Sequence, residues 1–531
     1  MRSAHLPVRT GSALAEAEPG KWIITVTVML GTLMAALDMS IVNVALPQLR
    51  GSLGASVEEI TWTATGYMLS NVCIMPAIGF FSSRFGRKNF YLACIVLFTI
   101  ASVLCGLAWN LSSMVLFRVL QGIGGGALIP ISQAIMRESF PPEEQGMAMG
   151  LYGLGVVMGP AFGPTLGGWL TDNLSWHWIF YINVPVGILN VLLVMRYIKD
   201  PPYLVRGKGK IDLAGLLLLV VSLSTLLVVL EKGEREAWFE SSLITTMTVI
   251  AVVGLIVFVW RELTVENPVV DLRILKNTTF ATGTFIAGIL MVGLNGSLFL
   301  MPIFVQQTLG YPAMDAGLLL MPRSLAMAVS MPLAGRFYNR LGPRSLIGVG
   351  LLVTSLSFWQ LSRLSLAVGY WDLFLPQVLQ GLGFGMIFVA LSTAALARVE
   401  RPAITAATGL YNVVRTVFGS FGIAMAATLF TRGISSYRAV LVEHVSSYRD
   451  ISVDWERMLT GAMAARGADA VTAHDRALKL LDGLVMRQAS MLSFNYVYVV
   501  VTILFILSVP LVLLLRVPRH TTTVEVEIAA E

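Results

Sequence analysis

Charged residues, cysteines and histidines are all scarce in this chain of 531 residues. Asp, Glu, Lys and Arg make up only 13% of it, and there are 3 cysteines and 5 histidines. The histidines are scattered and the cysteines fall inside apolar runs, so the sequence predicts neither a metal site nor a disulfide framework. It contains no ATP-binding Gly-x-x-x-x-Gly-Lys-Ser/Thr motif and no nucleophile–base pair, so we expect no enzyme activity and no cofactor.

What the chain has in abundance is apolar sequence. Hydrophobic residues make up 56% of it, in runs long enough to cross a bilayer, which is typical of an all-α polytopic membrane protein. The net charge of +6 is spread over turns, so we expect the lipid bilayer as a partner and no nucleic acid. The first run carries an Asp and lacks a cleavage site, which favours a retained helix over a signal peptide. The fourteen expected spans are 22–46, 60–81, 89–108, 112–136, 146–170, 177–198, 211–231, 242–261, 279–303, 315–337, 343–364, 371–397, 404–430 and 489–515.

An internal repeat runs through these apolar segments. The stretch Val119–Gly126 returns as Val378–Gly385, 259 positions later, and Gly150-Leu151-Tyr152 returns at the same offset. A basic turn, Gly79–Lys88, returns as Gly335–Arg344 with an offset of 256. Duplicated helical bundles are typical of secondary transporters, whose substrate site lies between the repeats.

The repeat distance holds six spanning helices and two more, so we expect two parallel six-helix halves separated by an inserted pair. The expected regions are a cytoplasmic N-terminal tail (1–21), a six-helix half (22–198), the inserted pair with its flanking loops (199–278), a second six-helix half (279–515) containing a long periplasmic loop (431–487), and a cytoplasmic C-terminal tail (516–531). Within the long loop, Asp454–Met463 looks helical.

The distribution of basic residues orients the bundle. With both termini inside, the cytoplasmic segments hold 22 Lys and Arg residues and the short outer loops hold 4. This asymmetry follows the positive-inside rule, and an added or lost helix would scramble it. We therefore expect a multi-pass protein of the bacterial cytoplasmic membrane with both ends in the cytoplasm.

Four ionisable residues fall within apolar runs, where they are costly unless they face a cavity or a partner: Asp38, Arg118, Arg323 and Arg415. Asp38 and Arg118 lie at similar depths, so we expect them to interact, with Asp38 as a protonatable coupling group. The alternative is a static ion pair that fixes helix packing. Arg415, whose repeat counterpart is Val156, is a candidate counter-ion for substrate, and Arg323 is expected to be an interfacial residue.

Glycines and prolines in the same segments suggest close helix packing and a conformational role. Small residues four apart let two helices approach, and Pro160 and Pro164 can bend the fifth run. The candidate gating residues are Gly79, Arg84, Gly86, Arg87, Gly159, Pro160, Gly163, Pro164, Gly167 and Gly168.

A cavity between the halves would be lined by apolar and a few polar side chains. Met and aromatic residues at helical spacing also serve as ordinary packing, and both interpretations stay open. The candidate cavity residues are Met34, Asn43, Tyr67, Gln121, Phe299, Met386, Phe388 and Arg415.

Five of these segments together resemble motifs of the fourteen-spanner drug:proton antiporters of the major facilitator superfamily, the EmrB/QacA type. The segments are Leu37–Pro47, Gly79–Lys88, Arg118–Gly122, Gly159–Gly168 and Trp176–Pro185. The resemblance implies the major facilitator fold, proton coupling through Asp38 and Arg118, and an export direction marked by the fifth-run motif. It also implies a periplasmic adaptor and an outer-membrane channel as partners.

Two positions depart from the pattern of that family. Ser83 stands where an acidic residue is common, and His177 stands where an Arg is common. The first departure removes the usual charge-relay partner of the basic turn, and the second places a pH-sensitive group beside the sixth run.

We therefore expect a proton-coupled antiporter that exports hydrophobic or amphiphilic drugs and toxic compounds by alternating access. Two alternatives stay open: a proton-coupled uptake symporter of a small organic solute, and a non-transporting membrane sensor. Flux in everted vesicles would discriminate among all three.

Overall fold

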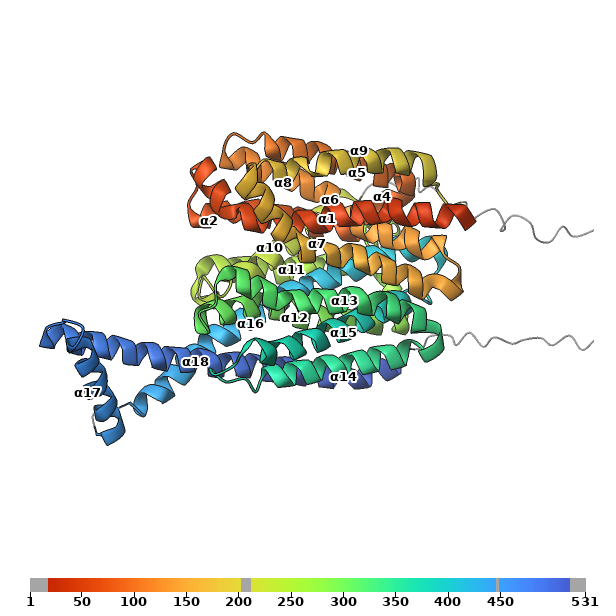
Figure 1. The fold of residues 1–531 in the computed structure, drawn as a ribbon. Coiled ribbons are helices and arrows are strands. Elements are labelled where there is room, and N and C mark those ends of the chain that lie inside the picture. Colours follow the sequence, from red (N-terminus) through yellow and green to blue (C-terminus); the bar gives the residue numbers. More distant parts are fainter. Residues whose placement is uncertain (1–17, 202–211, 446–447, 516–531) are drawn as a thin grey trace, which may run out of the picture. The chain divides into compact units, whose positions relative to one another are not determined.

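The computed structural model describes residues 18–201, 212–445 and 448–515. Most of the expected N-terminal tail, part of the linker before the inserted pair and the C-terminal tail lie outside the described residues. Every regular element in the described part of the chain is helical (Figure 1).

The chain divides into two compact units. The first comprises residues 1–74 and 80–208, and the second comprises 75–79 and 209–531. Helices of the first unit are α1 (Glu18–Leu53), α2 (Val57–Ile60), α3 (Trp62–Ile74), α4 (Ile78–Phe85, which enters from the second unit), α5 (Arg87–Gly106), α6 (Leu111–Ser139), α7 (Gln145–Asn173), α8 (Trp178–Tyr181) and α9 (Asn183–Tyr197). Helices of the second unit are α10 (Leu213–Lys232), α11 (Ser242–Thr264), α12 (Thr278–Ile303), α13 (Ala313–Leu341), α14 (Pro343–Leu361), α15 (Tyr370–Ala394), α16 (Ile404–Glu443), α17 (Asp450–Ala464) and α18 (Ala470–Ser508).

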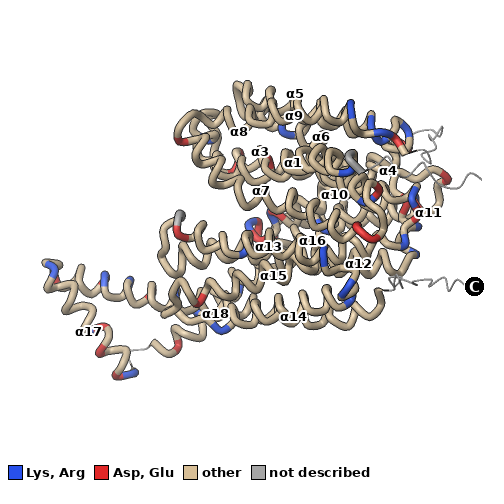
Figure 2. Tube along the Cα trace, turned by 45° about the vertical axis from the view of Figure 1, so that its right-hand side comes forward, with Lys and Arg blue, Asp and Glu red and all other residues tan. Residues whose placement is uncertain are grey.

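The described residues contain 14 helical segments long and apolar enough to cross a membrane, as the sequence predicted. Lys, Arg, Asp and Glu gather mainly near the ends of these helices, while their middles are almost free of charge (Figure 2). The prolines around the ninth and tenth runs do not remove a span, because α12 ends at Ile303, a π-helical turn covers Phe304–Thr308, and α13 then begins at Ala313.

The internal repeat is visible in the packing of each unit. A Cβ added to Gly122 would lie 2.4 Å from the carbonyl oxygen of Tyr67, and one added to Gly381 would lie 2.2 Å from that of Arg323. Gly122 and Gly381 are 259 positions apart, and Tyr67 and Arg323 are 256 apart. The same helix crossing is therefore built twice, with glycine at the point where two backbones touch.

The two basic turns also match. Gly86 is the N-cap of α5 with φ +88°, and Gly342 is the N-cap of α14 with φ +79°. Glycine adopts this left-handed conformation without the steric cost that a Cβ would bring, which explains why both copies of the turn carry it.

The inserted pair α10 and α11 belongs to the second unit, where α10 packs against α11 and α16. Asp212 caps α10 by accepting from the Gly215 amide at 3.0 Å and pairs with Arg261 of α11 at 2.7 Å. The hydrogen bond from Arg261 lowers the pKa of Asp212, which keeps this carboxylate charged at neutral pH.

Residues 431–487 connect the last two spans as helix over most of their length. α16 continues to Glu443, α18 starts at Ala470, and α17 covers the stretch expected to be helical. At about 1.5 Å per residue, α16 is about 60 Å long, twice the ~30 Å of a bilayer core. We call residues 436–482 the extension; Figure 1 shows it projecting past the neighbouring helix ends of its unit.

Candidate functional site

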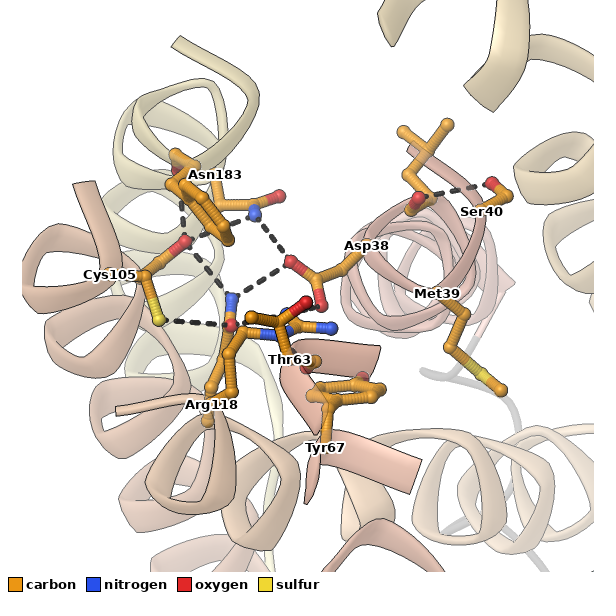
Figure 3. A network of polar contacts seen from close by, with 12 residues as sticks. Asp38, Met39, Ser40, Thr63, Tyr67, Cys105, Arg118 and Asn183 are labelled. Atoms are coloured by element: carbon orange, nitrogen blue, oxygen red, sulfur yellow. Dashed lines mark hydrogen bonds and ion pairs between the residues drawn. The ribbon is translucent and has the colours of Figure 1, made fainter. Parts of the chain in front are cut away.

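Asp38 and Arg118 form a buried ion pair in the first unit. Nη1 of Arg118, on α6, lies 2.5 Å from Oδ2 of Asp38, on α1. Their side chains are 1% and 0% exposed, so neither charge reaches solvent. The contact expected from their similar depths is therefore present (Figure 3).

Two amide side chains donate to the other carboxylate oxygen. Nε2 of Gln121 and Nδ2 of Asn183 lie 2.9 and 3.4 Å from Oδ1 of Asp38. Oγ of Ser102 accepts from both amides at 3.1 Å and donates to the Phe180 carbonyl at 2.9 Å. These bonds fix both amide groups with their N–H groups toward the carboxylate.

The guanidinium of Arg118 is held on its remaining sides. Nε donates to the carbonyl oxygen of Thr63 at 3.0 Å, and Nη1 also donates to Oε1 of Gln121 at 2.6 Å. The ring of Tyr67 lies 4.2 Å from Cζ, within cation–π range. Helices α1, α3, α5, α6 and α9 all contribute atoms to this network. A change in the charge of Asp38 therefore affects contacts in most helices of this unit.

The Asp38 carboxyl group thus has a guanidinium and two amide N–H groups as its hydrogen-bond partners. Uptake of a proton would remove the charge that holds Arg118, leaving a buried cation without its counter-ion. A neutral Asp38 would therefore leave this network incompletely paired.

A glycine seam joins α1 to α7 beside this network. Added Cβ atoms on Gly159, Gly163 and Gly167 would lie 2.4, 2.0 and 2.7 Å from atoms of Ala36, Ser40 and Ile41. The hydroxyl of Ser40 donates to the Gly159 carbonyl at 2.8 Å, two residues from Asp38. Gly168 lies outside the seam, with no atom closer than 3.9 Å, and Pro160 and Pro164 are exposed on a helix that continues through both.

The basic turn has acidic partners that sequence reasoning missed. Arg87 pairs with Glu138 of α6, and Asp200 accepts from the Lys88 amide at 2.8 Å. An added Cβ on Gly86 would lie 2.6 Å from the same Asp200 carboxylate. Glu138 and Asp200 thus supply acidic groups near the turn that carries Ser83, although neither stands in the motif itself.

The other two candidate gating residues are placed differently. Gly79 lies in the segment 75–79 of the second unit, where its added Cβ would be 2.5 Å from that of Ala406. Arg84 is half-buried at the end of α4.

The cavity candidates separate into several environments. Gln121 and Tyr67 belong to the Asp38 network described above, so their contacts there are polar or cation–π. Met34 is buried and Phe299 and Met386 are half-buried. Asn43 is exposed and donates at 3.4 Å to the Met39 carbonyl of its own helix.

Arg415 is buried in the second unit, on α16. Its Cζ lies 4.6 Å from the Phe388 ring and 5.5 Å from that of Tyr411, and Nη1 donates to Oδ1 of Asn412 at 3.3 Å. Nε is buried without a hydrogen-bond partner. The candidates Phe388 and Arg415 therefore lie together.

The expectation that Arg323 is interfacial is wrong. Its residue is 3% exposed inside α13, and its guanidinium contacts Gln380 and Ser297. The sequence placed it near a helix boundary because of the flanking prolines, but α13 starts ten residues earlier, at Ala313.

His177 precedes α8, stacked on Trp176 with ring centroids 3.7 Å apart. Partial burial lowers the pKa of His177, so its ring is neutral at neutral pH. It therefore does not reproduce the fixed charge of the Arg that is common at this position.

Asn183, Ser102 and Thr63 were not predicted as site residues. Asn183 lay within the Trp176–Pro185 motif, and an amide in an apolar run was the available signal. Thr63 contributes only its backbone carbonyl, for which side-chain identity carries no signal.

Comparison with known proteins identifies the architecture around this site. Residues 28–423 match the family model described as Major Facilitator Superfamily. The chain is 35% identical to the multidrug export protein EmrB of Haemophilus influenzae over 81% of this chain and 84% of that protein. It is 32% identical to the fatty acid resistance protein FarB of Neisseria gonorrhoeae over 97% of this chain and 98% of that protein.

Solved structures show the same fold. The crystal structure of the human organic anion transporter MFSD10 superposes with a TM-score of 0.58 at 13% identity, covering 92% of this chain and 100% of that one. At this identity the likeness concerns the fold alone.

Proposed function

Because the chain belongs to the major facilitator superfamily, and within it to the EmrB type, we propose that it exports hydrophobic or amphiphilic toxic compounds in exchange for protons. Its relatives carry the names multidrug export protein and fatty acid resistance protein. The fourteen apolar helices of the described residues make it a multi-pass membrane protein.

The observation that carries proton coupling is the buried Asp38–Arg118 pair. We assign Asp38 as the proton carrier, since it is the buried carboxylate at the centre of five helices. In the ionised state it holds Arg118 and Gln121 as found here. A proton on Asp38 weakens both contacts and allows the helices of this unit to repack.

The glycine seam links this event to alternating access. Ser40 bonds to Gly159 across the seam, and Asp38 lies in the same turn of α1. When the Asp38 network rearranges, α1 moves against α7 along a surface of backbone contacts. Substrate and proton then shift the equilibrium between inward- and outward-open states through their different affinities for each.

The positive-inside rule supports an orientation in the bacterial cytoplasmic membrane with both ends in the cytoplasm. The extension then lies on the periplasmic side. It presents exposed apolar residues outside the spans, among them Ile451 and Val471 at 76% and 80% exposure. We propose that these residues contact a periplasmic adaptor, which connects to an outer-membrane channel.

The test is proton release from everted vesicles, in which respiration acidifies the lumen and a pH-sensitive dye reports its loss. Adding an exported compound to wild-type vesicles restores fluorescence. Asp38→Asn abolishes that response, because Asn cannot carry a proton. Asp315→Asn, which removes an exposed carboxylate from the start of α13, responds like wild type. An Asp38→Asn response at the wild-type rate rules out Asp38 as the coupling group.

A further inference from the structure

The second unit holds a buried polar cluster at positions equivalent to the Asp38 network. Gln380 lies 259 positions after Gln121, the offset of the surrounding motif. Ser297 lies 259 positions after Asp38, and its hydroxyl donates to Oε1 of Gln380 at 3.3 Å. Each repeat thus brings its first helix and its fourth helix together through a glutamine.

A guanidinium occupies this second cluster, although it comes from another helix. Arg323 is the repeat counterpart of Tyr67, as the matching glycine contacts show. Its Nη1 lies 3.1 Å from Oε1 of Gln380 and 3.5 Å from Oγ of Ser297. The hydroxyl of Tyr498, on α18, lies 3.1 Å from the same Ser297 oxygen.

The two clusters differ in charge. Arg118 has a carboxylate at 2.5 Å, whereas no ion pair joins Arg323 to any carboxylate of the described residues. In α12–α16 and α18, the buried charged residues within the described ranges are Arg323 and Arg415, both cations. A buried charge without a counter-ion is strongly unfavourable, so this interior calls for an anion.

The cluster also offers a second donor. Nε2 of Gln380 is buried and has no hydrogen-bond partner. The guanidinium of α13 and the amide of α15 are neighbouring donors, because Nη1 of Arg323 lies 3.1 Å from Oε1 of the same amide, and a carboxylate has oxygen acceptors for both.

Two aromatic side chains pack against Tyr498, whose hydroxyl group belongs to the cluster. The rings of Phe494 and Phe358 lie 4.6 and 5.8 Å from that of Tyr498. A charged head group bound at Arg323 would therefore lie beside apolar surface, which suits a ligand with a hydrocarbon chain.

We propose that Arg323 and Gln380 bind the carboxylate of an exported amphiphilic acid. The proposal deepens the proposed export function, on which it rests, by naming the chemical class of substrate and the half that recognises its charge. Asp38 then carries the proton in one repeat, and Arg323 in the equivalent cluster of the other repeat receives the charge of the substrate.

The test compares three probes of equal chain length: decanoate, its uncharged methyl ester and decylamine. Their binding to the full-length protein in detergent is measured by isothermal titration calorimetry. Arg323→Gln removes the cation. Ser297→Asp keeps the cation and gives it an internal carboxylate at the position equivalent to Asp38. This second variant keeps the test valid if Arg323→Gln fails to fold.

We expect both variants to bind decanoate about tenfold more weakly or worse. Arg323→Gln loses a charge-assisted hydrogen bond, and in Ser297→Asp the internal carboxylate occupies the guanidinium. Both variants should bind the ester as wild type does. Arg336→Gln, which removes an exposed charge from the same helix, keeps wild-type binding of decanoate. Wild-type binding of decanoate by Ser297→Asp, or equal loss of acid and ester, overturns the proposal.

Proton release separates this inference from the export function. If decylamine releases protons from everted vesicles, while decanoate neither binds nor releases protons, the export function is supported and the anion site is ruled out. If decanoate binds through Arg323 but no probe releases protons, the anion site is supported and proton-coupled export is ruled out.

Discussion

At the scale of single residues, the behaviour of Asp38 follows from its partners. Its carboxylate is 0% exposed and meets a guanidinium and two amides. Such a group can carry a proton only if its partners rearrange, because a protonated acid no longer compensates Arg118. In the proposed mechanism, the ion pair is both a stabilising contact and the element that senses protonation.

Stability measurements on the pair separate these two roles. Arg118→Gln leaves the Asp38 carboxylate buried without its cation, which we expect to destabilise the protein by about 3–5 kcal/mol. The double variant Asp38→Asn/Arg118→Gln removes both charges and should recover much of that loss. Thermal unfolding in detergent measures the difference.

Proton-coupled flux is expected to be absent in both variants, including the double variant that regains stability. A purely structural ion pair predicts the opposite, a double variant that is both stable and coupled.

At the scale of secondary structure, α7 shows how a motif acts through packing. Its glycines at 159, 163 and 167 meet α1 with no room for a side chain, while a Cβ on Gly168, in the same motif, would make only an ordinary contact at 3.9 Å. Only the face of the helix turned toward α1 requires glycine. The motif therefore contains more glycines than close packing against α1 requires.

Two glycines of α7 test this seam. A Cβ on Gly159 would lie 2.4 Å from backbone atoms of Ala36, which cannot move aside as a side chain can. Gly159→Ala should therefore cost about 1–3 kcal/mol and reduce flux. Gly155→Ala, whose nearest neighbour is a Thr32 methyl at 3.6 Å, should be neutral or slightly stabilising, since Ala favours helix over Gly.

Thermal stability and vesicle flux of the two variants are compared under the same conditions. Equal tolerance of both substitutions would show that the α1–α7 contact is not close in the working protein.

At the scale of the whole molecule, one repeat unit has diverged into two chemistries. The helix crossings at Gly122 and Gly381 are the same, yet one cluster holds an ion pair and the other an arginine with neutral partners. The second unit has also gained the α10–α11 pair and the extension, whose helices α16 and α18 continue from its spanning helices.

Removing the extension tests its proposed contact with an adaptor. Arg438 and Asp482 pair at 2.8 Å at its base, so residues 439–481 can be replaced by about six Gly and Ser residues, which reach about 13 Å. We expect proton release in everted vesicles to be kept and drug resistance of intact cells to be lost. Full resistance in cells that produce this variant contradicts the adaptor contact.

The number and approximate position of the spans, the repeat, and the pairing of Asp38 with Arg118 could all be predicted from the sequence. Hydropathy, length and depth are properties of each segment alone, so they can be read without knowledge of its neighbours. The prediction of helix at Asp454–Met463 was confirmed for the same reason.

Which side chains meet depends on the three-dimensional packing of the helices. Asn183, Ser102 and the Thr63 carbonyl join the Asp38 network because of how five helices are rotated about their axes. That rotation depends on the packing of all the helices together, so it cannot be predicted from the hydrophobicity of a single segment. The burial of Arg323 beside Gln380 was decided in the same way, which is why the sequence placed this arginine at the membrane surface and the fold placed it inside.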